Sequence, residues 1–209
     1  MDKLFIAAAG LTIIIMSYGN VVYAQDARSN MPVPAAEIYK NMLAFAKNGE
    51  GSKVGKSLIL LNPVISEVNK RFCIKIESDI NNALYKEDRI SITASVTKLI
   101  VIDIRNLFME SIESIDKDFD RMVLRIRIAF TEYQTIDPML EKKDFDASTK
   151  IKNNFRKAYF LSEGKKFDEL KETIKEIEGL LKKNFPDAFE KDSCLKKSMP
   201  TGLPVDLPS

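Results

Sequence analysis

The stretch FDELKETIKEIEGLL, residues 167–181, decides the fold class of this chain. A spacing of three and four residues places side chains on one face of an α-helix, as along the seam of a coiled coil. Charged residues occupy the other face, and Pro186 provides a stop signal. The stretch therefore predicts an amphipathic helix that packs against its neighbours through five apolar residues: Phe167, Leu170, Ile174, Ile177 and Leu181.

The same spacing recurs upstream and predicts five more helices. The second of these opens at Asn62-Pro63, and the fourth ends before Pro138. Asp146 or Ser148 caps the fifth, which closes at the turn Glu163-Gly164-Lys165. The expected helices cover residues 35–47, 62–83, 88–115, 119–137 and 148–162.

Two segments between or within these helices are ambiguous. Residues 48–57 hold Gly49, Gly51 and Gly55, and we interpret them as a flexible connection between helices. The run 99–102, Leu-Ile-Val-Ile, is rich in β-branched residues and is compatible with a buried strand. The periodicity on both sides of the run favours instead a helix that is buried around much of its circumference.

Successive amphipathic helices joined by short turns pack as antiparallel neighbours. The predicted fold class is all-α, an up-and-down helical bundle of four main helices plus shorter helices. We expect this bundle domain to span residues 25–186. A Pro-containing, extended C-terminal arm follows over residues 187–209.

The composition agrees with a helical protein and excludes several kinds of catalytic site. Among 209 residues, 45% are apolar, and 32 basic against 30 acidic residues give a net charge of +2. The chain has no histidine, which removes Ser-His-Asp and Cys-His nucleophile systems, the usual zinc sites and di-iron bundle sites. A near-neutral charge argues against nucleic acid as a partner. We therefore expect no cofactor, no metal site and no enzyme activity.

Residues 1–24 have the pattern of a secretory signal peptide. An apolar stretch over residues 4–16 follows a short basic start, and Ala24 stands where signal peptidase cuts before Gln25. We expect export to the periplasm or an equivalent extracytoplasmic lumen, with no membrane span after signal removal. A retained membrane anchor is the alternative, because apolar character resumes at Val21.

The chain has two cysteines, Cys73 and Cys194. An even number of cysteines in an exported protein favours a disulfide, so we predict that these two are joined. The bond would close a loop long enough to stabilise the fold by about 4–5 kcal/mol in the chain-entropy model. Two free thiols, or a bridge from Cys194 to a partner, are the alternatives.

The C-terminal arm has the composition of a docking segment. Prolines restrict its unbound conformations, so it loses less entropy when it lies in a groove of a partner. A disordered tail is the alternative. The partner-docking residues we expect are the three apolar side chains spaced by these prolines: Leu203, Val205 and Leu207.

Two short motifs admit a chemical and a structural interpretation. Gly55-Lys56-Ser57 resembles the end of a phosphate-binding loop, but Glu50 stands where that loop needs its first glycine. Asp116, Asp118 and Asp120 have the alternating spacing of a calcium loop, without its central glycine or its final glutamate. We interpret the first as part of the connection and the second as helix capping.

Asp79 and Asp103 fall on or beside apolar stripes and are the best candidates for perturbed carboxylates. Two inward acids support acid and base chemistry in glycosidases. The structural interpretation is that each acid pairs with a cation from a neighbouring helix, for which Arg125 and Arg127 are candidates.

Two stretches carry a resemblance, ITASVTKLIVIDIRNLFMESIESI over residues 92–115 and IDPMLEKKDFDASTKIKNNFRKAYFLSE over residues 136–163. They look like parts of small exported helical accessory proteins of periplasmic respiratory enzymes, such as the tubule-inducing subunit of anammox-type nitrite oxidoreductase. The resemblance implies a scaffold that organises a redox enzyme without carrying haem. It contains no motif of diagnostic chemistry, so it assigns no functional residue.

These observations lead to one expected function and two alternatives. We expect an exported, non-catalytic interaction protein, an accessory or assembly subunit of a larger complex, with other protein subunits, a respiratory enzyme or further copies of itself as partners. A helical bundle that binds a small ligand in its core is the first alternative. An enzyme that uses Asp79 and Asp103 is the second.

Overall fold

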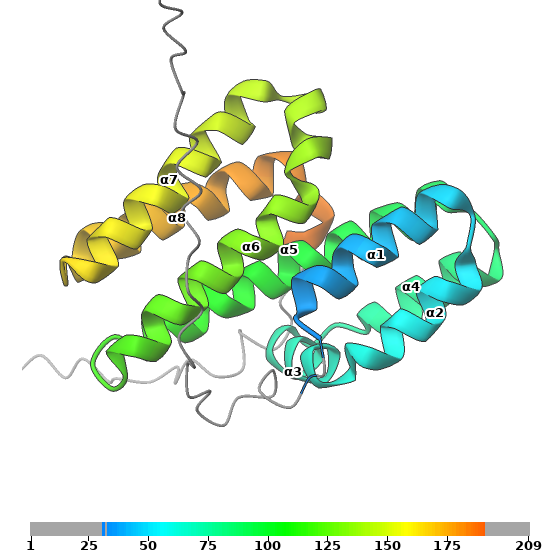
Figure 1. Ribbon diagram of the computed structural model, residues 1–209, viewed down its shortest axis with the longest axis horizontal. Helices are drawn as coiled ribbons and strands as arrows, with labels where there is room; N and C mark the ends of the chain where they lie inside the picture. Colours follow the sequence, from blue (N-terminus) through cyan, green and yellow to red (C-terminus); the bar gives the residue numbers. More distant parts are fainter. Residues whose placement is uncertain (1–30, 32, 191–209) are drawn as a thin grey trace, which may run out of the picture.

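The computed structural model describes residues 31 and 33–190, which form an all-helical protein (Figure 1). Over these residues the chain forms α-helices and one closing 3-10 helix, and no strand. Their bounds are α1 Ala35–Asn48, α2 Gly51–Leu60, α3 Asn62–Phe72, α4 Ile76–Tyr85, α5 Arg89–Glu113, α6 Phe119–Lys143, α7 Phe145–Glu163, α8 Phe167–Asn184 and η2 Pro186–Phe189.

The four longest helices are the last four. Helices α5 and α6 have 25 residues each, α7 has 19 and α8 has 18, whereas α1 to α4 have between 10 and 14. The predicted all-α bundle of four main helices with shorter helices is confirmed. None of the described helices combines the length and the apolar character that a membrane crossing requires.

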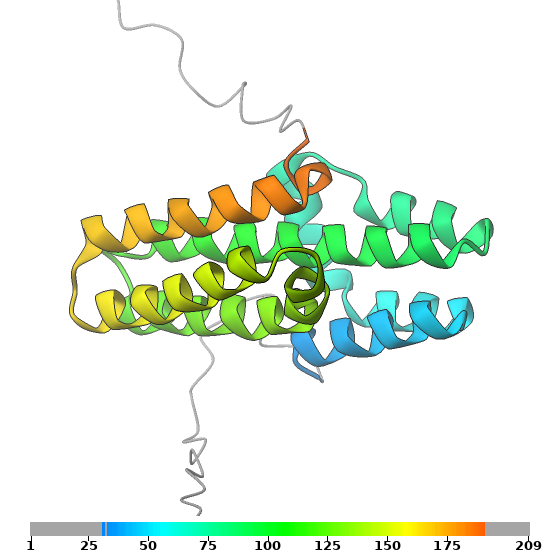
Figure 2. The ribbon, with the colours of Figure 1, turned by 90° about the horizontal axis from the view of Figure 1, so that it is seen from above.

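Helix α5 is the central element. It contacts α1, α3, α4, α6, α8 and η2, and it runs along most of the molecule (Figure 2). Helices α1, α2 and α4 pack near its N-terminal half, and α6, α7 and α8 gather around its C-terminal half. Its central residues Leu99, Ile100, Val101 and Ile102 are each at most 2% exposed. The helical interpretation of this run is confirmed, because α5 has neighbours on several sides.

The helix expected over residues 62–83 is two helices, so that prediction was wrong. The chain breaks after α3 at Cys73, whose φ of 51° lies in the left-handed region. The side chain of Asn69 accepts a hydrogen bond from the backbone N–H of Ile76 at 3.2 Å, which satisfies one free donor at the start of α4. Apolar stripe residues on both sides of the break, Phe72 and Ile76, are still buried.

The flexible connection expected over residues 48–57 was also wrong, because most of it is helix α2. Val54 and Leu58 are buried, and their spacing is helical. Gly51 allows close packing here, since a Cβ at this position would lie 3.3 Å from a methyl group of Leu84 on α4. Gly49 ends α1, with a φ of 75° that favours glycine.

Two boundaries around α6 and α7 differ from the prediction. Helix α6 continues through Pro138 to Lys143, because burial of the flanking Ile136 and Leu140 outweighs one lost backbone hydrogen bond. Helix α7 is capped by Asp144, which accepts a hydrogen bond from the N–H of Ala147 at 2.9 Å. The expected caps Asp146 and Ser148 lie inside α7 instead.

The hairpin between α7 and α8 agrees with the prediction. Helix α7 ends at Glu163, and α8 begins at Phe167 and ends before Pro186. The left-handed residue of this turn is Lys165, with a φ of 55°, and not Gly164. The seam residues 170, 174, 177 and 181 are all at most 1% exposed.

The C-terminal end of the described chain is held on α5 by Arg105. Its guanidinium lies 4.8 Å from the ring centroid of Phe72 and 4.2 Å from that of Phe189. It also donates a hydrogen bond to the carbonyl of Ala188 at 2.7 Å. Because one guanidinium contacts both rings, the chain after η2 starts close to the end of α3.

The disulfide prediction joins the segment after Glu190 to Cys73, which follows Phe72 directly. Cys194 lies outside the described residues, as do Leu203, Val205 and Leu207, so the disulfide and the docking arm stay predictions. Mass analysis under non-reducing conditions, on protein made in an oxidising compartment, checks the disulfide. Two free thiols in the monomer would refute it.

Candidate functional site

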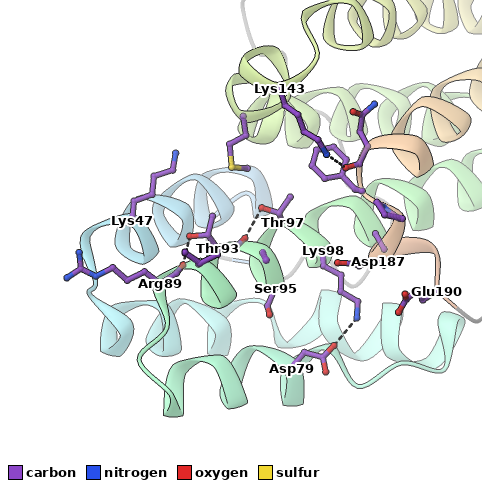
Figure 3. Close-up of a pocket in the computed structure, with 17 residues that line it drawn as sticks. Lys47, Asp79, Arg89, Thr93, Ser95, Thr97, Lys98, Lys143, Asp187 and Glu190 are labelled. Atoms are coloured by element: carbon purple, nitrogen blue, oxygen red, sulfur yellow. Dashed lines mark hydrogen bonds and ion pairs between the residues drawn. The ribbon is translucent and has the colours of Figure 1, made fainter.

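The candidate site is a surface groove of about 900 Å³ beside the N-terminal half of α5 (Figure 3). We call it the α5 groove. Helices α1, α4, α6 and α8 each contribute side chains to it, as does the segment that contains η2. It forms because α5 extends past the ends of α6 and α8, so part of its surface has no helix packed over it. The α5 residues that line it are Arg89, Ile90, Thr93, Ala94, Ser95, Thr97 and Lys98.

Apolar side chains from three elements line the middle of the α5 groove. Ala94 is exposed on α5, and its small side chain leaves a hollow in the surface. Met139 of α6 and Phe185 after α8 are both half-buried and border this hollow together with the exposed Pro186. Such a surface can accept apolar side chains of a binding partner.

The charges of the α5 groove are separated. Lys47 and Arg89 lie at one end, and Asp187 and Glu190 lie at the other (Figure 3). Within residues 33–190 none of these four side chains forms an ion pair, whereas Lys98 at the centre pairs with Asp79 at 3.0 Å. Lys143 also lines the groove and donates a hydrogen bond to the carbonyl of Asn184 at 2.9 Å, so the unpaired charges that remain are basic at one end and acidic at the other.

The guanidinium of Arg89, at the basic end, lies against the backbone at the end of α1. A Cβ added at Gly49 would lie 2.6 Å from Nε of Arg89, so this glycine allows the guanidinium to approach the backbone. The positive φ of Gly49 independently excludes most other residues. Any larger residue at position 49 would displace Arg89 as well as strain the turn.

Two large apolar side chains beside the α5 groove are exposed to solvent. Ile90 is 82% exposed at the start of α5, and Tyr85 is 92% exposed at the end of α4. The two residues flank the short α4–α5 turn. Ile90 also lines the groove, so the apolar surface continues from the groove to its edge.

The two carboxylates singled out from the sequence are not brought together. Asp103 is fully buried on α5 and accepts a hydrogen bond from the hydroxyl of Tyr39 at 2.7 Å. Asp79 is exposed on α4 and pairs with Lys98 across the α5 groove. The expected pairing with a cation from a neighbouring helix is confirmed for Asp79, but neither named arginine is that cation, because Arg125 pairs with Glu110 at 2.7 Å and Arg127 with Glu163 at 3.6 Å.

The two short motifs have structural roles. Gly55-Lys56-Ser57 lies inside α2, where the backbone N–H groups serve the helix and cannot cradle a phosphate. Asp118 caps α6 by accepting a hydrogen bond from the N–H of Arg121 at 3.0 Å, as the capping interpretation predicts. The described part of the chain holds no cluster of three metal-ligating side chains.

A second polar cluster joins α6 to α7 around Asp137. Its carboxylate accepts hydrogen bonds from the hydroxyls of Tyr133 at 2.8 Å and Ser148 at 2.6 Å, and it pairs with Lys152 at 3.2 Å. Burial acts to raise the pKa of Asp137, but the two hydroxyl donors and Lys152 outweigh it and hold this pKa below its ordinary value. Burial and the neighbouring Asp137 raise the pKa of Tyr133, which keeps its hydroxyl protonated.

This cluster predicts a pH dependence of stability. A carboxylate whose pKa is lower in the folded state stabilises the fold above its unfolded pKa, and the contribution disappears as the pH falls through the folded pKa. Asp137→Asn should therefore reduce the free energy of unfolding at pH 7, with a deficit that shrinks below the ordinary Asp value of 3.8. Urea unfolding of both proteins between pH 7 and pH 2.5 measures this, and a deficit independent of pH would contradict it.

Comparison of the chain with protein-family models, with curated proteins and with solved structures found no significant match. The residues of the α5 groove are therefore assigned from geometry alone. The periodicity that places core residues gives no signal for Lys47, Met139 or Phe185, because they meet only in the folded chain. One feature of the sequence could have indicated the site, because Ile90 is a large apolar residue outside the buried stripe of its helix.

Proposed function

We propose that this chain is an exported, non-catalytic interaction protein that serves as an accessory or assembly subunit of a larger extracytoplasmic protein complex. The signal-peptide pattern of residues 1–24 supports export. The resemblance of residues 92–115 and 136–163 to accessory proteins of respiratory enzymes makes a redox enzyme a candidate partner.

The observation that carries the interaction role is the exposed Ile90 at the edge of the α5 groove. Burying a large aliphatic side chain contributes about 1.5–3 kcal/mol, and only a small part of this free energy is gained while Ile90 remains 82% exposed. Exposed apolar surface that continues into a groove is typical of protein interaction sites. The buried carboxylate Asp103 is instead hydrogen-bonded inside the bundle, which is typical of a structural role.

The chemistry of the α5 groove defines the partner. Its apolar middle fits aliphatic side chains, and its basic end, with Lys47 and Arg89, fits a carboxylate. We infer a partner protein that presents an aliphatic segment followed by an acidic residue. Charge at the ends sets the orientation of this segment, and the apolar contact supplies most of the affinity.

Affinity capture from the native exported fraction tests the proposal. The immobilised wild-type chain should retain a discrete partner, and the double variant Tyr85→Ser, Ile90→Ser should retain at least about tenfold less, because about 1.4 kcal/mol corresponds to tenfold in affinity. Phe160→Ser is the matched control, since Phe160 is 70% exposed on α7, away from the α5 groove. Equal capture by wild type and double variant would refute this surface as the interaction site.

Small-ligand binding is kept as a second candidate because of the size of the α5 groove. Its volume of about 900 Å³ is within the range of ligand pockets. The α5 groove lies at the surface, whereas the ligand-binding alternative from the sequence placed the ligand in the bundle core. A thermal-shift screen against metabolites tests this candidate, and stabilisation lost in Ala94→Glu would support it.

A further inference from the structure

We propose that the α5 groove is occupied by the C-terminal arm of its own chain, through residues 199–209. The arm then acts as an internal competitor for the partner. The inference about occupancy concerns the isolated chain, and only its regulatory consequence rests on the proposed function. Three observations support the occupancy: the place where the described chain ends, the length of the arm, and the order of apolar and charged residues along the arm and along the groove.

The described chain ends at the α5 groove itself. Glu190 lines the acidic end of the groove. Arg105 fixes the preceding turn by contacting the ring of Phe189 and by donating a hydrogen bond to the carbonyl of Ala188. The arm therefore begins at a defined point on the rim, and its residues are held near the groove by the chain.

The arm is long enough to reach any part of the groove. The segment between Glu190 and Leu203 has enough residues to reach about 40 Å if it is extended at about 3.1 Å per residue. The α5 part of the groove, from Arg89 to Lys98, is about 14 Å long at about 1.5 Å per residue. A short flexible connection produces effective concentrations in the millimolar range, which favours the arm of the same chain over that of a second copy.

The apolar residues of the arm match the middle of the groove in spacing. Leu203, Val205 and Leu207 alternate along the chain, so they would share one side of a segment with β-type extended backbone. Leu203 and Leu207 would then lie about 13 Å apart at about 3.3 Å per residue. This is close to the length of α5 between Ile90 and Lys98, about 12 Å at about 1.5 Å per residue.

The order of charges also matches when the arm runs from the acidic end to the basic end. Between Glu190 and Leu203 the chain carries three lysines, Lys191, Lys196 and Lys197, and one acid, Asp192, so the stretch that leaves the acidic end has a net positive charge. Asp206 comes later on the chain, so its charge would lie nearer to the basic end formed by Lys47 and Arg89, with the attraction acting at a distance because Asp206 alternates with the three apolar side chains. A segment running in the reverse direction would place like charges together.

Occupancy of the groove by the arm would cover Ile90 and its apolar surroundings. The partner inferred from the groove and the arm share one chemistry, an aliphatic segment with an acidic residue toward its end. The arm is therefore a competitor that partner binding must displace. In this proposal Leu203, Val205 and Leu207 bind to their own chain. The composition alone had led us to expect that they bind a separate partner.

Site-specific photo-cross-linking of the purified mature chain tests the proposal without any partner. The photoreactive residue p-benzoylphenylalanine replaces Leu207, and the protein is irradiated at low concentration and digested. Benzophenone inserts into nearby C–H bonds and reacts readily with methionine, so Met139 is a favourable acceptor in the groove. We expect intramolecular cross-links to peptides of α5, to Met139 of α6 and to the segment at Phe185.

Matched variants make the outcome decisive. Ala94→Glu fills the groove and should lower the yield of these cross-links by at least about tenfold, equivalent to about 1.4 kcal/mol. Ala44→Glu, which replaces an exposed alanine of α1 outside the groove, should leave it unchanged. Asp206→Lys should also lower the yield. Dimeric products alone, cross-links elsewhere, no cross-links, or a yield insensitive to Ala94→Glu would each overturn the proposal.

Discussion

Replacing Ile177 by aspartate is expected to lower the free energy of unfolding by about 4 kcal/mol. Ile177 is fully buried in the seam of α8, the helix with the clearest amphipathic pattern of the chain. The substitution removes its apolar contacts and leaves a carboxylate without solvent in the core. Urea unfolding followed by the helical circular dichroism signal measures the loss.

Two controls separate this effect from a general weakness of α8. Ile177→Val keeps the site apolar and should cost only about 1 kcal/mol. Glu176→Asp changes an exposed neighbour and should cost less than about 0.5 kcal/mol. If Ile177→Asp were tolerated as well as Glu176→Asp, this face of α8 would not be part of the core.

Replacing Arg125 by methionine is expected to lower the free energy of unfolding by about 3–5 kcal/mol. The Arg125 guanidinium lies 2.7 Å from a carboxylate oxygen of Glu110, and the two side chains are only 10% and 4% exposed. It also donates a hydrogen bond to the hydroxyl of Ser114 at 2.6 Å. Methionine has a similar volume but removes the positive charge and the hydrogen bonds of Arg125. The carboxylate of Glu110 is then left charged and without its ion-pair partner inside the protein.

The matched control is Arg121→Met on the same helix. Arg121 contacts Asp118 at 3.9 Å near the surface, where ion pairs contribute between about 0 and 1 kcal/mol. The two variants therefore differ mainly in the burial of the pair that is broken. Equal losses for both would show that Arg125 contributes no more than a surface ion pair.

The apolar periodicity predicts the core well because it reports directly on burial. Leu170, Ile174, Ile177 and Leu181 were expected to point inward, and all are buried. The helical interpretation of the run 99–102 was correct for the same reason. Where several helices surround one another, the pattern along each helix is sufficient to predict its buried face.

The helix ends were predicted less well because they depend on tertiary contacts. Nothing in the sequence near Cys73 is a strong helix breaker, and the break there is stabilised by Asn69, whose side chain accepts from the N–H of Ile76. Pro138 is a strong breaker, yet α6 continues through it because Ile136 and Leu140 are held in the core. In both places packing decided between alternatives that local propensity could not separate.

The candidate site could not be predicted from the sequence, because it joins residues that are far apart along the chain. Lys47, Ala94, Met139 and Phe185 line one groove but belong to four separate segments. Asp79 and Asp103 were each expected to pair with a cation from a neighbouring helix, and the structure gives Asp79 an ion pair with Lys98 but gives Asp103 a buried hydrogen bond from Tyr39. A stripe pattern indicates which face of a helix turns inward, and it does not indicate which helix lies opposite.

Photo-cross-linking from position 90 in the native exported compartment tests the central claim, that the chain binds a partner protein at the edge of the α5 groove. The chain carries p-benzoylphenylalanine in place of Ile90, and a second version carries it in place of Phe160 as the control. The account predicts one discrete heterologous product from position 90, stronger when residues 199–209 are deleted, and none from position 160. An absence of products from position 90, or equal products from both positions, would contradict it.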